Sequence, residues 1–324
     1  MNSVVLNFRK PFDLTMESAI QLIFAPKRKY LKDEYPVNKI SFIAKFVFLV
    51  LISPFTLFCY GTALVLDVMQ KNRNFTYLKG ELNSEDREVQ KVLSWNVCAL
   101  FGGLPMAFGG VKKVKDRMGL IAEKIKEINA DVISLSEVSP PAADLLFRKL
   151  KDTYAHFYTR IRKDPFLTLD SALFVASKVE IKDPKMIELP LGGLMRRAIF
   201  SFQVADTKFL TTHLHPGLDE KDKEVRLKQV NEIKSLSNGK TILFGDLNIR
   251  RGDEFKNVGL GGHFSDPTEG EPITATDRMN GDEVIESIDY FLLSKDLSGR
   301  VEIVQAFDEN GGLSDHHALS LELR

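Results

Sequence analysis

The 324-residue sequence has only two cysteines, no surplus of basic residues and no cluster of Cys and His. Cys59 lies inside an apolar run and Cys98 lies beside a strand-like segment, so the sequence indicates neither a disulfide framework nor a redox compartment. Without a Cys/His cluster there is no basis for a zinc site of the usual kind. Metal chemistry, if present, must use oxygen ligands.

The charge balance argues against non-specific binding of nucleic acid. The whole chain has 44 basic and 44 acidic residues, and residues 89–324 carry 32 Lys and Arg against 35 Asp and Glu, a net charge of −3. Proteins that hold a polyanion through many phosphates usually show a basic surplus. We therefore regard a nucleic acid as an improbable partner that composition alone does not exclude.

One apolar run indicates contact with a membrane. Residues 46–66 form 21 consecutive positions without a charge, and as a helix they would span about 31 Å, close to the thickness of a bilayer core. Pro54 lies in the middle, so the segment is expected to be a single span or a re-entrant hairpin. Six basic residues precede it and three follow it within short distances, a bias too small to fix the side of the membrane. The alternative is a buried helix of a soluble domain.

The remaining sequence predicts one large α/β domain. Strand-like runs lie at residues 91–98, 131–138, 171–177, 197–204, 208–213, 241–246, 288–293 and 318–323, and helical spacing occurs at 111–129 and 219–236. Many strands with few helices favour two packed sheets with helices outside. We divide the chain into a basic, amphipathic segment (1–45), a membrane segment (46–66), a linker (67–89) and a catalytic domain (90–324).

Polar side chains follow the apolar strands at their ends. The residues in such positions are Asn96, Glu137, His213, Asp246, Asn248, Asp289, Asp315 and His316. Carboxylate and amide oxygens suit a hard cation that binds phosphate oxygens, and an imidazole can move a proton or stabilise developing charge. The pattern predicts phosphoryl chemistry with Mg²⁺, or Mn²⁺ in its place. Taken alone, the segment from Asp246 to Asn248 is equally typical of a turn.

Six short segments together resemble the endonuclease/exonuclease/phosphatase superfamily, and they occur in the order that the family shows. They are Ser94-Trp95-Asn96-Val97, Ser136-Glu137-Val138, Thr212-His213-Leu214, Gly245-Asp246-Leu247-Asn248, Ile288-Asp289-Tyr290 and Ser314-Asp315-His316. The resemblance implies a deoxyribonuclease-like αββα sandwich of four layers. It covers about residues 91–324.

The resemblance also implies roles for these residues. Glu137 would be the main metal ligand, with Asn96 and Asp315 assisting. Asp246 would orient or deprotonate the attacking water, and Asn248 would hydrogen-bond the phosphate. His213, and His316 paired with Asp289 or Asp315, would flank the phosphate. Further candidates for substrate binding are Asp170, Arg196, Arg197 and His215; Cys98 stands where some members carry a carboxylate.

Local sequence favours a phospholipid substrate. His213-Leu214-His215 and Asp116-Arg117-Met118 are similar to the neutral sphingomyelinase branch, and residues 101–110 form an apolar, glycine-rich loop suited to contact with a bilayer. We expect a membrane-bound, sphingomyelinase-like phosphodiesterase and infer no protein partner. The alternatives are a phosphoinositide 5-phosphatase-like enzyme, a deoxyribonuclease-like endonuclease and an inactive membrane adaptor.

Overall fold

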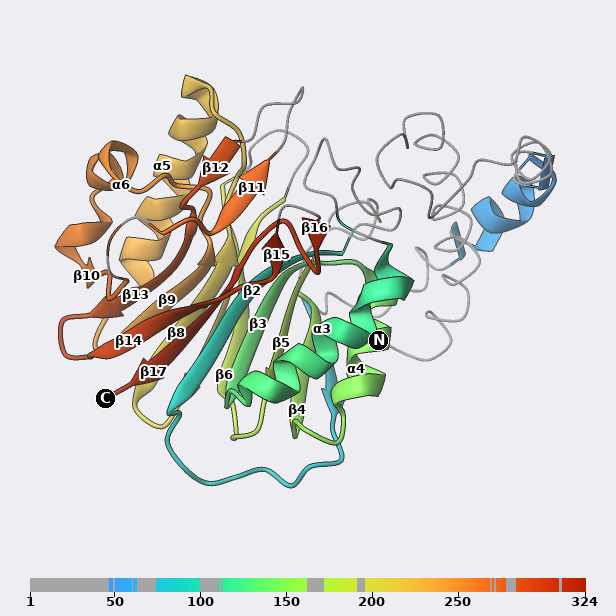
Figure 1. Cartoon of the computed structure of the whole chain (residues 1–324), viewed down its shortest axis with the longest axis horizontal. Helices are drawn as coiled ribbons and strands as arrows, with labels where there is room; N and C mark the ends of the chain where they lie inside the picture. Colours follow the sequence, from blue (N-terminus) through green and yellow to red (C-terminus); the bar gives the residue numbers. More distant parts are fainter. Residues whose placement is uncertain are drawn as a thin grey trace.

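The structure is a computed structural model and contains two β-sheets with helices on their outer faces (Figure 1). The residues it describes are 47–48, 50–59, 61–62, 74–99, 111, 113–161, 172–190, 196–268, 270, 272–277, 284–308 and 311–324. Asp170 and the loop at 101–110, both named above, lie outside them.

The first sheet has seven strands and is centred on β3 and β2, which run parallel. Their apolar side chains are buried on both faces, as is typical of central strands covered on two sides. The strand order is β1 (Thr76–Lys79), β4 (His156–Ile161), β5 (Ala172–Ser177), β3 (Val132–Val138), β2 (Lys91–Ala99), β17 (Ala318–Leu323) and β14 (Gly299–Val304).

The second sheet has six strands, and its central pair, β8 and β9, is also parallel. The order is β10 (Phe264–Ser265), β13 (Asp289–Ser294), β9 (Thr241–Asp246), β8 (Thr207–His213), β7 (Ala198–Val204) and β6 (Lys182–Glu188). Two small hairpins complete the strands: β11 (Ala275–Asp277) with β12 (Val284–Glu286), and β15 (Phe307–Asp308) with β16 (Gly311–Gly312).

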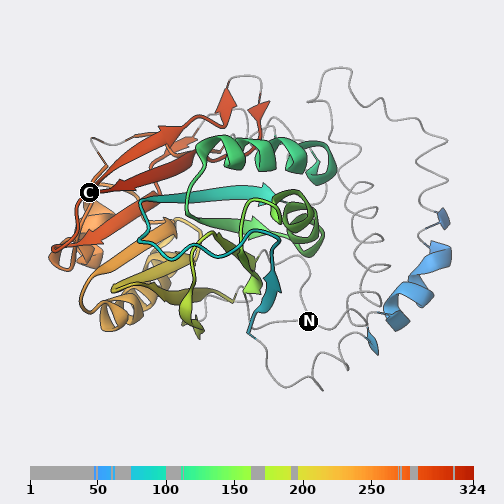
Figure 2. The same ribbon diagram turned by 90° about the horizontal axis from the view of Figure 1, so that it is seen from below.

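Three apolar clusters define the layers of the sandwich (Figures 1 and 2). One lies between the seven-stranded sheet and the helices α3 (Val114–Ile128) and α4 (Pro140–Leu150). Another fills the space between the sheets, and the third packs the six-stranded sheet against α5 (Glu220–Leu236), α6 (Asp253–Val258) and the 3-10 turn η3 (Leu260–Gly262). The predicted sandwich of two packed sheets flanked by helices is confirmed.

The sheet begins earlier in the chain than the sequence indicated. β1 pairs in antiparallel register with β4, from Thr76 opposite Thr159 to Lys79 opposite His156. The range 67–89, expected to be a linker, therefore contributes an edge strand, and the folded domain begins before residue 90.

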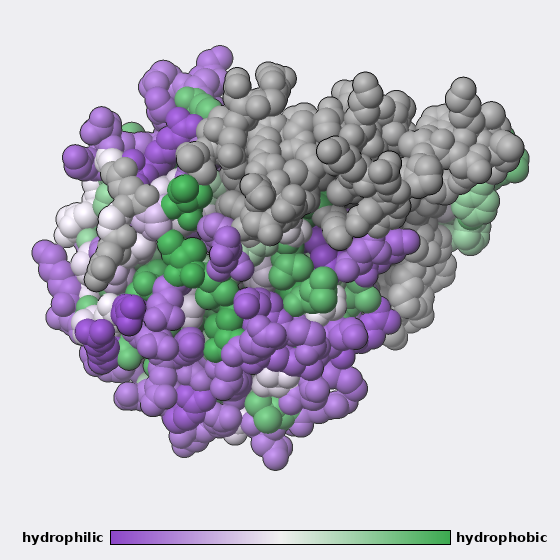
Figure 3. Space-filling view, in the orientation of Figure 1, coloured by the Kyte–Doolittle hydropathy of each residue, from purple (hydrophilic) through white to green (hydrophobic). Residues whose placement is uncertain are grey.

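The predicted membrane segment is helical where it is described, at residues 47–48, 50–59 and 61–62. This helix stands apart from the sandwich in both ribbon views. No helix within the described residues combines the length and the apolar character needed to cross a bilayer. The face of the sandwich seen in Figure 3 is mainly hydrophilic over the described residues, with several smaller apolar areas across its middle.

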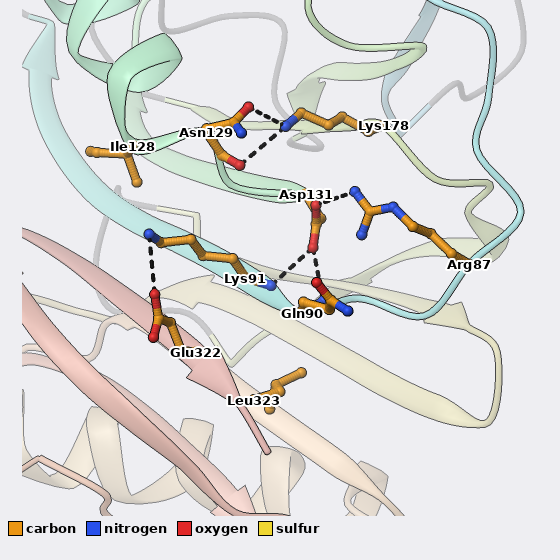
Figure 4. A pocket seen from close by; sticks show the side chains of 9 residues that line it. All are labelled: Arg87, Gln90, Lys91, Ile128, Asn129, Asp131, Lys178, Glu322 and Leu323. Atoms are coloured by element: carbon orange, nitrogen blue, oxygen red, sulfur yellow. Dashed lines mark hydrogen bonds and ion pairs between the residues drawn. The ribbon is translucent and has the colours of Figure 1, made fainter.

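A polar cavity of about 490 Å³ lies where β2 and β3 begin and β17 ends (Figure 4). Asp131 accepts hydrogen bonds from the backbone N–H groups of Gln90 and Lys91 and pairs with Arg87 at 2.5 Å. Lys178 donates to the carbonyl and side-chain oxygens of Asn129 at 3.1 and 2.6 Å. These pairs fasten the beginnings of the two parallel strands, whose other ends carry Asn96 and Glu137.

Candidate active site

The strand ends bring the predicted polar residues together at the end of the sandwich opposite that cavity. In the sheet register, Asp246 at the end of β9 lies beside His213 of β8 and opposite Asp289 of β13. Gly245 allows this close approach: its φ is +135°, and a Cβ there would lie 2.0 Å from the Thr212 carbonyl oxygen. Glycine is therefore required directly before Asp246.

Asp246 is the centre of the site and is 2% exposed. Its Oδ2 accepts from Asn96 Nδ2 at 3.0 Å and lies 3.4 Å from His213 Nε2, while its Oδ1 accepts from the Asn248 N–H at 3.0 Å. Burial, and then repulsion from Asp289, raise the pKa of Asp246 to about 7. A carboxylate with such a pKa can accept a proton near neutral pH.

Asp289 and His316 form a hydrogen-bonded pair. The Asp289 Oδ2 lies 2.8 Å from His316 Nδ1, and both side chains are buried. Burial alone would lower the pKa of His316, but Asp289, followed by Asp246 and Asp315, raises it well above its usual value. His316 is therefore a held imidazolium whose Nε2 faces Asp246 at 3.9 Å.

His213 is the neutral imidazole of the site. Burial, with Arg197 and His316 nearby, lowers its pKa well below the usual value. Arg197 Nη1 lies 3.1 Å from His213 Nδ1, and because a guanidinium only donates, Nδ1 is the acceptor. The ring proton therefore resides on Nε2, directed at Asp246. The site thus contains one charged and one neutral histidine, a difference set by their neighbours.

Glu137 lies at the edge of this cluster, together with Asp315. It is half-buried at the end of β3 in a left-handed conformation, with φ of +57°. Burial and the neighbouring Asp315 raise the pKa of Glu137, whereas His316, Arg197 and a hydrogen bond from Asn96 lower it. Burial also raises the pKa of the Cys98 thiol, with Asp315 and Glu137 adding to the effect. The thiol is thus a neutral neighbour of two carboxylates.

The donor set fits a divalent cation. Glu137 and Asp315 lie near each other, as do Asp246 and Asp289; burial first, and then repulsion within each pair, raises the pKa values of Glu137 and Asp246. One ligand atom each from Asp246, Asp289 and His316 lie within 4.8 Å of one another. Glu137 and Asp315 form a second set of oxygen donors beside these three residues. Oxygen donors of this kind suit hard cations.

The other candidates are placed differently. Asn248 Nδ2 donates to the Leu214 carbonyl at 3.1 Å, which holds its amide beside His213. His215 instead points to Asp222 of α5, at 2.9 Å. Arg197 enters the site, whereas Arg196 pairs with Glu188 at 2.9 Å along β6.

Thr274 and Ser314 support the site, although the sequence did not single out either one for this role. Thr274 Oγ1 accepts from the N–H of Asp289 at 3.1 Å, and its carbonyl accepts from the N–H of His317. Ser314 Oγ donates to the Asn96 carbonyl at 2.6 Å. A hydroxyl group that hydrogen-bonds to the backbone produces no periodic pattern in the sequence. Only the Ser314-Asp315-His316 motif therefore pointed to this region.

The comparisons with known proteins agree with this geometry. The Endonuclease/Exonuclease/phosphatase family model matches residues 93–316. Among solved structures, TDP2 of D. rerio complexed with a single-strand DNA product is 18% identical with a TM-score of 0.57, covering 74% of this chain and all of that one. Beta toxin from Staphylococcus aureus is 18% identical (TM-score 0.55; 72% and 100% covered), and SmcL is 17% identical (TM-score 0.56; 73% and 99%).

No curated protein matches the chain significantly. The solved structures are too distant in sequence to indicate more than the fold, and the family model covers more than two thirds of this chain. The six predicted motif segments all fall within or at the edge of the matched range. The chain belongs to the endonuclease/exonuclease/phosphatase family of metal-dependent phosphoric ester hydrolases.

Proposed function

We propose that this protein is a Mg²⁺-dependent phosphodiesterase that hydrolyses the headgroup bond of a membrane phospholipid, in the manner of a sphingomyelinase. The observation that carries the hydrolytic part is the arrangement around Asp246, a buried carboxylate with a pKa of about 7 beside one charged and one neutral histidine. Such a set can activate water and stabilise a phosphorane-like transition state.

Each residue has a distinct part in the proposed reaction. Asp246 accepts a proton from the water that attacks phosphorus, the phosphorus–oxygen bond to the lipid alcohol breaks, and the alcohol leaves with a proton taken from solvent. The bonds from Asn96 and Asn248 fix the direction of the Asp246 carboxylate. The His316 imidazolium, held by Asp289, stabilises charge on the phosphoryl oxygens. His213 donates a hydrogen bond from Nε2 to the phosphate. Arg197 donates to Nδ1 and so keeps the ring proton on Nε2. Glu137 and Asp315, with Asn96, would hold the magnesium ion, which supplies charge neutralisation at the phosphate.

Support for a lipid substrate comes from exposed apolar side chains. In the described helical residues, 47–48, 50–59 and 61–62, seven large apolar side chains are between 49 and 75% exposed: Val47, Phe48, Val50, Leu51, Phe55, Leu57 and Phe58. Exposed apolar surface of this extent is typical of an interaction site. We propose that this segment attaches the enzyme to a membrane, either across it or within one leaflet.

Two further exposed apolar side chains are close in sequence to residues of the site. Leu218, 55% exposed, is in the loop that follows His213, and Ile273, 45% exposed, directly precedes Thr274. We propose that both contact the lipid surface while a headgroup enters the site. Their position is the reason for preferring a lipid to a soluble phosphodiester.

The test is release of phosphocholine from sphingomyelin vesicles in the presence of Mg²⁺. We expect release by the wild type and its loss in Glu137→Ala and His316→Ala. No release by the wild type from any lipid, or equal release by both variants, would overturn the proposal. A panel with phosphoinositides and DNA distinguishes the 5-phosphatase-like and endonuclease alternatives, and inactivity on every phosphodiester would indicate an adaptor.

A paired measurement isolates the lipid contact. Leu218→Ser and Ile273→Ser should lower turnover of vesicles but leave hydrolysis of soluble bis(p-nitrophenyl) phosphate unchanged. Leu120→Ser is the matched control, because Leu120 is 58% exposed on α3. Equal activity of all three variants on vesicles would contradict a role for the two loop residues.

A further inference from the structure

Arg117 is a fully buried arginine beneath the candidate active site. It lies in the first turn of α3 and is 0% exposed. Its Nη1 donates to the carbonyls of Val97 at 2.5 Å and Leu313 at 2.6 Å, and its Nη2 donates to the carbonyl of Cys98. One guanidinium thus binds main-chain atoms from two segments that are more than 200 residues apart in the chain.

Two of these carbonyls lie where the sheet is irregular. The pairing of β2 with β3 shifts register between Asn96 and Ala99, and Cys98 is left-handed, with φ of +43°. A buried carbonyl that leaves the regular ladder needs another donor. Charged donors form the stronger hydrogen bonds, and the planar guanidinium can serve several acceptors at once. Arg117 meets this need directly beside Asn96.

The third carbonyl connects this strand end to the other side of the site. Leu313 directly precedes Ser314, Asp315 and His316. The same two segments are joined by Ser314 Oγ, which binds the Asn96 carbonyl, and by Trp95 Nε1, which donates to the His316 carbonyl at 2.9 Å. The relative positions of Asn96, Asp315 and His316 therefore depend on a small set of bonds, three of which come from Arg117.

The acidic residues confirm how near the guanidinium is to the site. Burial lowers the pKa of Arg117, while the negative charges of Asp315 and Glu137 oppose this shift. An arginine remains protonated under such conditions. The side chain is thus close to the two carboxylates that would hold a cation, and it also binds the three carbonyls.

We propose that Arg117 is a positioning residue for the hydrolytic reaction, fixing Asn96 and the segment of Asp315 and His316 at the separation that cation binding and turnover require. The inference rests on the family's phosphoester hydrolysis and not on the identity of the lipid. Substitutions of residues that orient metal ligands commonly reduce metal affinity or activity about 10-fold to 100-fold.

The decisive variant is Arg117→Lys, because it keeps the charge and the aliphatic stem but cannot reach three carbonyls with one ammonium group. Arg117→Met removes the charge as well. Lys178→Met is the matched control: Lys178 is a buried cation that also binds a main-chain carbonyl, but at the opposite end of the sheet (Figure 4).

Three measurements are made on the full chain: Tm, Mn²⁺ binding by calorimetry, and kcat and KM for bis(p-nitrophenyl) phosphate. We expect Arg117→Lys to remain folded, to bind Mn²⁺ about 10-fold more weakly and to lose about 10-fold or more in kcat, with little change in KM. Lys178→Met should lower Tm and leave Mn²⁺ affinity and kcat unchanged.

Wild-type Mn²⁺ affinity and kcat in Arg117→Lys, with only a lower Tm, would overturn the inference and leave Arg117 a purely structural residue. If Arg117→Met does not fold, Arg117→Lys still decides the question. Inactivity of the wild type on every phosphodiester would instead refute the proposed function, and Mn²⁺ affinity would still test Arg117.

Discussion

Replacing Asp246 by asparagine should stabilise the metal-free protein while strongly reducing its activity. The pKa of Asp246 is raised from 3.8 to about 7, chiefly by burial and secondly by Asp289. The folded state therefore retains a proton that the unfolded state has lost between about pH 4 and pH 7. The protonated Asp246 therefore stabilises the folded state at low pH, and this contribution is lost as the pH rises through that window. Above pH 7 the ionised carboxylate lowers the free energy of unfolding by a constant amount.

The magnitude follows from the pKa difference. About three pKa units correspond to roughly 4 kcal/mol. Asparagine removes the charge, but its amide NH₂ must replace an oxygen that accepts from Asn96 or from the Asn248 N–H, at a cost of about 1 to 2 kcal/mol. The net gain at pH 8 should be about 2 to 3 kcal/mol, equivalent to roughly 4 to 12 °C in Tm for a domain of this size.

The assay is thermal unfolding in EDTA between pH 5 and pH 8, with turnover measured separately in Mg²⁺. The Tm gain of Asp246→Asn should grow with pH up to about 7 and then level off, and turnover should fall by about 10² to 10⁴. Asp206→Asn, at a surface carboxylate paired with Lys240, should change neither quantity appreciably. A lower Tm than the wild type at pH 8, or a gain independent of pH, would refute the reasoning.

Three further outcomes test other parts of the site. Thr274→Val should lower the free energy of unfolding by about 1 to 3 kcal/mol and reduce kcat, because it leaves the buried N–H of Asp289 without its acceptor. Thr274→Ser keeps the hydroxyl and should retain both quantities. Urea unfolding measures the first and steady-state kinetics the second. Gly245→Ala should cost more than about 3 kcal/mol in urea unfolding because its Cβ would meet backbone, whereas Gly239→Ala, in open space at φ of +66°, should cost much less. The Tm increase caused by Mg²⁺ should be larger at pH 8 than at pH 5.5, since protons compete for Glu137, whose pKa is raised; an equal increase at both values would contradict this.

The sequence predicted the central strands well because β2, β3, β8 and β9 are apolar runs that end in polar residues. α5 was equally readable: Asp219 accepts from the backbone N–H of Asp222, whose side chain returns a bond in a capping box. The elements that were missed are short or depend on tertiary contacts. β1 has four residues, and α4 begins with Pro140-Pro141, which alone is compatible with either a turn or a helix start.

For the site, sequence order identified the residues but not how they pair. The motifs did not distinguish Asp289 from Asp315 as the partner of His316, or Arg196 from Arg197 as the arginine in the site, because such choices depend on side-chain direction. The structure pairs His316 with Asp289 and brings Arg197 to His213. The predicted roles of Glu137 and the others in catalysis stay predictions.

The chain has a single tryptophan, Trp95, which is 1% exposed and donates its indole N–H to the main-chain carbonyl of His316. Because no other indole contributes to fluorescence excited near 295 nm, the emission of this protein reports one location. That location is the backbone of His316, a histidine of the candidate active site. Movements of this loop on cation or ligand binding can therefore be followed optically, in the unlabelled enzyme and in real time.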